Sequence, residues 1–319
     1  MNRRCGGMTL LELLLALGLG AVLMLGASSM LLAVSASHAA QASSARMDDS
    51  GRYAMDAIAR ALRQSAYVNW DAGAGAWRPS AEDSTSLAGL DARSLGKNAE
   101  GISNSLPDAV QGSDVLAVRF QGAGAAQGGD GTVLNCAGFG VGAAASESGR
   151  GWSIFHVAIG SDGQGELRCK YRAANGWGAD AIIRGVDSFQ VLYGLDTDTP
   201  ADGVANLYVN ATELDARDAA LVLPGENAAQ RQRQLHRRTH WKRVASVRVA
   251  LLLHGEDDDG GKAGQTGPPQ FDLFGPGYSD AEGARDAGTR VIVASLPARQ
   301  QGRLRKLVQA TVMLRNAAL

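Results

Sequence analysis

The hydrophobic positions divide the chain into three zones with different periods. Residues 13–34 contain no charged side chain. A run of this length can cross a hydrocarbon core as a helix, which takes about 20 residues. We therefore expect one membrane-spanning helix near the N-terminus.

The segment 35–66 keeps a helical pattern but becomes amphipathic. Its apolar positions recur at steps of three, four and seven, at Met47, Ala54, Met55, Ile58 and Leu62. Charged residues occupy the opposite side, and no proline precedes Pro79. The pattern predicts one continuous helix from residue 9 to about residue 66, whose second half packs against the rest of the protein.

Beyond Trp70 the pattern changes to short β-branched or apolar runs bounded by Gly, Asp, Asn or Pro. We expect strands at 115–120, 152–159, 167–171, 189–195, 244–253, 290–296 and 307–314. Long loops separate them at 72–112 and 121–150, with a further loop at 255–288. The sequence predicts an α+β fold, in which a long N-terminal transmembrane and stalk helix packs on an antiparallel β-sheet head.

Charges at the N-terminus set the expected orientation. Arg3 and Arg4 precede the apolar run, so the positive-inside rule keeps the leader in the cytoplasm and places residues beyond about 35 in the periplasm. Glu12 lies at the start of the run, and the next basic residue is Arg46. A carboxylate at the centre of a membrane helix costs about 2.5–3.5 kcal/mol. We therefore expect Glu12 to have a partner.

Cleavage between Gly7 and Met8 would supply that partner. The new α-amine would lie four residues before Glu12 and would be positively charged near neutral pH. Within one helix, or between neighbouring helices of a filament, this amine could neutralise the carboxylate in a medium of low dielectric constant.

The residues Gly7-Met8-Thr9-Leu10-Leu11-Glu12 resemble the class III signal of type IV prepilins. In that family a prepilin peptidase cleaves after the glycine and methylates the new N-terminus. The resemblance implies cleavage between Gly7 and Met8, N-methylation of Met8, and an assembly role for Glu12, although Met8 replaces the more usual phenylalanine. A conventional signal peptide cleaved near residues 33–36 and an uncleaved anchor are the alternatives.

Several later segments resemble the PilW family of minor pilins. They are, in order along the chain, SGRYAMDAIARALRQSAYV, GSDVLAVRF, VDSFQVLYGLDTDTPADG, WKRVASVRVALLL and RLRKLVQATVMLRN. The resemblance implies a non-enzymatic minor prepilin that joins a type IV pilus or initiates its assembly. A J-like pseudopilin of type II secretion is the alternative, as is a pilus-tip subunit that binds a surface or DNA.

The same resemblance implies four segments: a leader (1–7), a transmembrane and filament-core helix (8–34), its amphipathic continuation (35–66) and a periplasmic β-rich head (67–319). The implied partners are prepilin peptidase, other major and minor pilins, and the inner-membrane assembly machinery. The chain is expected in the bacterial inner membrane before assembly and in the pilus afterwards.

Composition and cysteine content add two constraints. Lys and Arg number 31 against 32 Asp and Glu, a formal net charge of −1, which gives no global attraction to nucleic acid. Cys5 lies in the expected leader, so Cys136 and Cys169 are the one candidate pair in the head. An exported protein can keep such a pair as a disulfide. Free buried thiols are the alternative, and two cysteines alone do not make a zinc site.

An acidic turn could bind a cation. Asp196, Asp198 and Asp202 lie at short spacing within DTDTPADG, and calcium prefers oxygen ligands of this kind. Because Asp and Gly also form ordinary turns, a solvated turn without an ion is the alternative. No other cofactor is expected, because the sequence has no nucleophile elbow, zincin helix or phosphate loop.

A basic segment, residues 231–243 (RQRQLHRRTHWKR), concentrates positive charge around Trp241. Arg237, Arg238 and Lys242 are the candidates for a nucleic-acid contact, since basic side chains neutralise phosphates. A solvated loop or helix that precedes a strand, with Trp241 buried at its edge, is the favoured interpretation.

Overall fold

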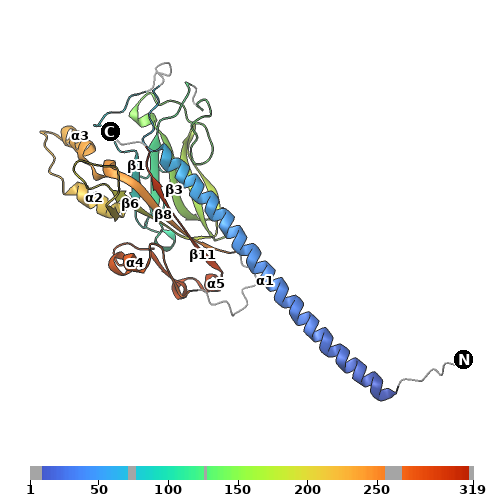
Figure 1. Ribbon diagram of the computed structural model, residues 1–319. Coiled ribbons are helices and arrows are strands. Elements are labelled where there is room, and N and C mark those ends of the chain that lie inside the picture. Colours follow the sequence, from blue (N-terminus) through green and yellow to red (C-terminus); the bar gives the residue numbers. More distant parts are fainter. Residues whose placement is uncertain (1–8, 71–76, 126–127, 256–267, 316–319) are drawn as a thin grey trace.

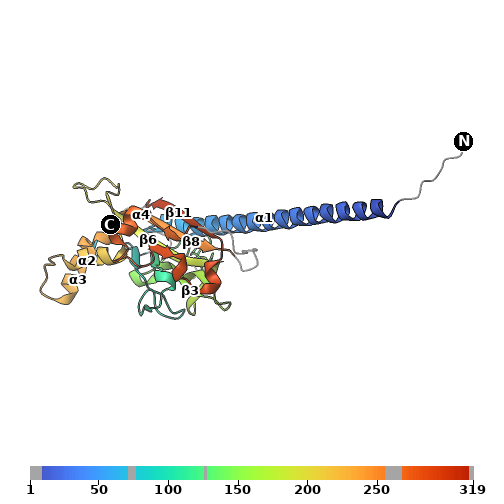
Figure 2. The same cartoon turned by 90° about the horizontal axis from the view of Figure 1, so that it is seen from below.

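A single long helix projects from a β-rich head in the computed structural model, which describes residues 9–70, 77–125, 128–255 and 268–315. The helix, α1 (Leu10–Gln64), has 55 residues, so it is about 80 Å long at 1.5 Å per residue. Its N-terminal end lies far from the head, as Figures 1 and 2 show. The predicted continuous helix is thus confirmed.

The two halves of α1 have different environments. Every side chain from Leu10 to Val34 is exposed, whereas the second half buries Met47, Ala54, Ile58 and Leu62 against the head. Gly51 allows this contact, because a Cβ atom there would lie 2.8 Å from Val308 Cγ2. The head therefore covers the amphipathic half of the helix and leaves the apolar half without a partner.

Two antiparallel sheets form most of the head. The first has five strands in the order β1-β2-β3-β4-β5, and the second has four in the order β11-β8-β6-β7. The first sheet contains β1 (Leu87–Leu90), β2 (Val115–Phe120), β3 (Gly151–Ile159), β4 (Gly165–Ala173) and β5 (Gly176–Arg184). The second contains β6 (Val186–Leu195), β7 (Leu207–Val209), β8 (Val244–His254) and β11 (Arg305–Met313).

A smaller layer covers the second sheet. It contains the paired strands β9 (Gln270–Asp272) and β10 (Arg290–Ile292), and the helix α4 (Pro276–Glu282) lies between them in the sequence. Odd-numbered residues of β8 such as Val249 pack in the main core with α1, while Ala250 and Leu252 pack with Leu273 and Val291 of the small layer. Since side chains alternate along a strand, β8 is apolar on both faces.

Some expected elements differ from the structure. The expected strand at 290–296 ends at Ile292 and continues as a 3₁₀ turn, Val293–Ser295. The expected loop 72–112 contains β1, and the expected loop 255–288 contains β9 and α4. The strands β5 and β7 were not expected, nor were the helices α2 (Ala211–Ala219) and α5 (Ala298–Gln301). The helix α3 (Ala228–Arg238) falls in the basic segment, for which we expected a loop or a helix. The predicted α+β architecture, a long helix packed on an antiparallel β-sheet head, is confirmed, although the head has two main sheets that share one core where we expected one sheet.

Candidate functional site

The start of α1 forms a capping box between Thr9 and Glu12. The Thr9 hydroxyl accepts a hydrogen bond from the Glu12 backbone N–H at 3.3 Å, and Glu12 Oε2 accepts from the Thr9 backbone N–H at 2.9 Å. This reciprocal arrangement satisfies two of the amide groups that a helix start leaves without intrahelical partners. The motif Thr-x-x-Glu ahead of an apolar run is a sequence signal for a capping box. Our sequence analysis considered the charge of Glu12 and did not use this signal.

Glu12 is also the one charged side chain in the exposed apolar part of α1. Among the described residues, α1 is the one helix long and apolar enough to cross a membrane. Gly7 and Met8, the expected cleavage and methylation sites, lie outside the described residues. The structure therefore places Glu12 at the first turn of the helix.

Cys136 and Cys169 form a disulfide. Their Cα atoms are 5.7 Å apart and their separation in sequence is 33 residues. Cys169 lies on β4 and is buried, while Cys136 belongs to the long loop between β2 and β3. The bond thus fixes that loop to the first sheet, and it confirms the disulfide interpretation over free thiols.

The acidic turn brings its three aspartates together. One carboxylate oxygen from each of Asp196, Asp198 and Asp202 lies within 4.8 Å of the others. Asp196 accepts hydrogen bonds from the backbone N–H groups of Asp198 and Gly203, at 3.0 and 2.7 Å. These bonds, led by the one from Gly203, lower the pKa of Asp196. Hydrogen bonds within the turn therefore hold its shape, and calcium binding here stays a prediction.

The basic segment forms α3 and the 3₁₀ turn His240–Arg243 that follows it. Arg237 lies 3.7 Å from Glu82, Arg238 donates to the carbonyl of Val222 at 3.3 Å, and Lys242 donates to that of Ala81 at 2.8 Å.

Trp241 is buried at the end of the same segment. Its indole N–H donates to Asp215 at 2.9 Å, and its ring packs edge-on against Tyr193. The interpretation as a solvated helix before a strand fits this arrangement. A nucleic-acid contact by Arg237, Arg238 and Lys242 stays a prediction.

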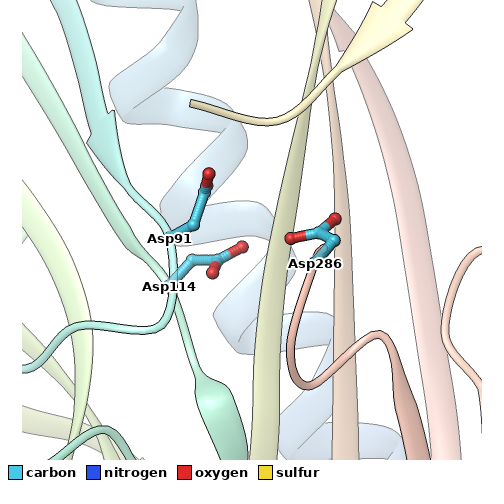
Figure 3. Close-up of side chains that lie close together, drawn as sticks. All are labelled: Asp91, Asp114 and Asp286. Atoms are coloured by element: carbon cyan, nitrogen blue, oxygen red, sulfur yellow. The ribbon is translucent and has the colours of Figure 1, made fainter. Parts of the chain in front are cut away.

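A second acidic cluster was not predicted from the sequence. Asp91, Asp114 and Asp286 each contribute one carboxylate oxygen, and the three oxygens lie within 4.8 Å of one another. Figure 3 shows that Asp114 and Asp286 point toward each other from different segments. The residues are far apart in the sequence and match no spacing motif, so only the tertiary structure brings them together.

Two family models match the chain. The Type IV Pilus-assembly protein W family matches residues 154–316, just over half of the chain, and the prokaryotic N-terminal methylation motif matches residues 2–28. No curated protein and no solved structure gives a significant match. The methylation motif implies processing by prepilin peptidase, and the family implies pilins as partners. The chain therefore belongs to the PilW family of type IV pilus-assembly proteins.

Proposed function

We propose that this chain is a minor pilin that is processed between Gly7 and Met8, methylated at Met8, and added to a type IV pilus or used to initiate one. Before assembly, residues 8–34 hold it in the bacterial inner membrane, residues 35–66 continue the helix, and the head of residues 67–319 lies in the periplasm. It acts by packing and not by catalysis. The methylation motif and the PilW match support this function.

The exposed apolar half of α1 is the observation on which the proposal depends. Large side chains such as Leu10, Leu23 and Leu31 are 77%, 74% and 71% exposed. An apolar surface of this length is unstable in water, because each buried methylene is worth about 0.8 kcal/mol. Lipid covers it in the membrane, and neighbouring helices would cover it in a filament.

The charge of Glu12 would favour the filament over the membrane as the environment of α1. Transfer of α1 from lipid to a filament core would be favoured if Glu12 met the methylated amine of Met8 in a neighbouring subunit, because a carboxylate alone in lipid is costly. Within its own chain Glu12 already contacts Thr9, so the intersubunit contact would replace or extend the capping box. The inner-membrane assembly machinery would supply the work of extraction.

The first experiment is the substitution Glu12→Ala in cells that make the pilus. We expect the variant to reach the membrane, to form the Cys136–Cys169 disulfide, and to be absent from sheared filaments. Normal incorporation of Glu12→Ala into filaments would contradict the assembly role.

The family match favours the pilus over the alternative of a J-like pseudopilin, because the model that matches residues 154–316 describes a type IV pilus-assembly family.

A further inference from the structure

The buried cluster of Asp91, Asp114 and Asp286 lies where the two sheets meet. Asp91 follows β1 and Asp114 precedes β2, and the antiparallel pairing of Leu90 with Val115 places them side by side. Asp114 also receives a hydrogen bond from the backbone N–H of Val191 on β6 at 2.9 Å. The cluster therefore connects the first sheet with the second.

The third carboxylate is brought in by a close backbone contact. Gly112 and Gly288 both have positive φ, at 68° and 93°, and a Cβ on Gly112 would lie 2.8 Å from the backbone of Ala287. Side chains at either position would force apart the segments that contain Asp114 and Asp286. Glycine is thus required here for the two buried aspartates to face each other, as Figure 3 shows.

One oxygen of the cluster is buried without a partner. Asp286 is 1% exposed, and its Oδ2 accepts a hydrogen bond from the Tyr278 hydroxyl at 2.8 Å. Its Oδ1 has no donor in hydrogen-bond geometry among the described residues, although the Asn210 side chain approaches the carboxyl group. Since a buried carboxylate oxygen without a partner is costly, this oxygen indicates a missing ligand.

No positive side chain offsets the cluster. Among the described residues, none of the three aspartates forms an ion pair with Arg, Lys or His within 4.0 Å. Burial, and then the charges of Asp91 and Asp286, raise the pKa of Asp114 well above its usual value. Burial raises the pKa of Asp286 to about 6. Backbone N–H groups donate to both oxygens of Asp91 and to both oxygens of Asp114, whereas none in the described ranges donates to Asp286 Oδ1. This oxygen is therefore the position that is open to a cation.

We propose that Asp91, Asp114 and Asp286 bind one calcium ion that joins the two sheets of the head. Calcium takes oxygen ligands at about 2.3–2.6 Å, so oxygens on one ion lie no more than about 5 Å apart. The three carboxylate oxygens meet this limit. Of the three aspartates, Asp91 also lines a surface pocket, together with Arg93 and Asp215.

The test uses the full processed chain in detergent, stripped of metal with EDTA and then given calcium alone or magnesium alone. We expect one calcium per chain by elemental analysis, and a rise in Tm of roughly 5 °C at calcium far above its dissociation constant. Asp286→Asn keeps the shape of the side chain and should lose both effects. Asp108→Asn, an exposed aspartate outside both acidic clusters, is the matched control and should keep both.

Three results would overturn the proposal. The first is no bound calcium and no change in Tm for the unmodified chain, which would mean that protons alone neutralise the cluster. The second is calcium binding that survives Asp286→Asn, and the third is binding that Asp108→Asn abolishes. If Asp286→Asn does not fold, Asp91→Asn takes its place, because Asp91 is only partly buried and the same loss is expected.

Discussion

The backbone N–H and the hydroxyl of Thr9 both donate to one oxygen of Glu12, at 2.9 and 3.1 Å. Glu12 thus has a local structural role as well as the proposed role between subunits. A substitution that removes the whole side chain disturbs both roles at once. The two can be separated, because a glutamine also forms a capping box but has no charge.

We predict that Glu12→Gln blocks incorporation into filaments while α1 stays helical. The amide can still accept from Thr9, but it cannot neutralise a positively charged amine in a neighbour. The measurement is the ratio of the variant in sheared filaments to that in membranes, by immunoblot against the unmodified chain.

The matched control is Thr9→Val, which removes the capping hydroxyl and keeps the charge of Glu12. We expect a local loss of about 1 kcal/mol in helix stability and filament levels close to those of the unmodified chain. If Glu12→Gln assembled normally and Thr9→Val did not, helix capping and not charge would be the function of Glu12.

Docking of α1 on the second sheet should depend on Gly51. A Cβ there would lie 2.8 Å from Val308 Cγ2 and 3.3 Å from Leu253 Cδ1. We predict that Gly51→Val lowers the free energy of unfolding of the head by about 2 kcal/mol, as expected for overpacking. Urea unfolding would measure it. Gly20→Val is the control, because nothing lies within 4 Å of a Cβ at that position, and an equal loss in both variants would refute the docking explanation.

Strong periodicity explains which elements could be predicted. In α1 the apolar positions repeat at helical spacing, and β2, β3, β6 and β8 are runs of buried residues. The edge strand β5 pairs on one side only, with β4, and most of its residues are partly or fully exposed. Without an apolar run it has no sequence signal, and the same is true of the short strands β1 and β7.

The functional residues show a similar division. Glu12 and the cysteine pair are candidates that the sequence alone predicts, because each is unusual in its local sequence: a carboxylate at an apolar run, and two cysteines in a head that is expected to be exported. The Asp91, Asp114 and Asp286 cluster depends on the contact between Gly112 and Gly288, which follows from packing and not from any local pattern.

A buried network joins three strands of the second sheet. Asp187 of β6 lies 2.8 Å from His254 of β8 and 2.7 Å from Arg305 of β11, and all three side chains are at most 3% exposed. We predict that Arg305→Ala destabilises the head by about 3 kcal/mol or more, because it leaves a buried carboxylate with one partner fewer. The exposed pair Arg52–Asp49 gives the control: Arg52→Ala should cost less than about 1 kcal/mol.

The same network predicts a pH dependence. Burial alone would raise the pKa of Asp187, but the hydrogen bond and charge of His254, with Arg305, lower it overall. A depressed pKa stabilises the fold at pH above the unfolded value of about 4, and this contribution is lost as pH falls through the folded pKa. The free energy of unfolding should therefore fall between neutral pH and pH below about 4, and it should fall less in Asp187→Asn than in the unmodified chain. An equal fall in both proteins would exclude Asp187 as a source of the pH dependence.

The disulfide should stabilise the head by restricting the unfolded chain. For a loop closed over 33 residues, the chain-entropy model gives about 3–4 kcal/mol. We predict a loss of about this size in Cys136→Ala/Cys169→Ala, measured by urea unfolding under non-reducing conditions. The unmodified chain under reducing conditions should unfold at the same urea concentration as the variant, and a large difference between them would contradict this explanation.

The central claim is that processing creates a charged N-terminus beside Glu12. Intact mass and N-terminal sequencing of the chain purified from membranes test it most directly. The account predicts a chain that begins at Met8 and bears one N-methyl group. A chain that begins at Met1, or one that begins after residue 36, would contradict it.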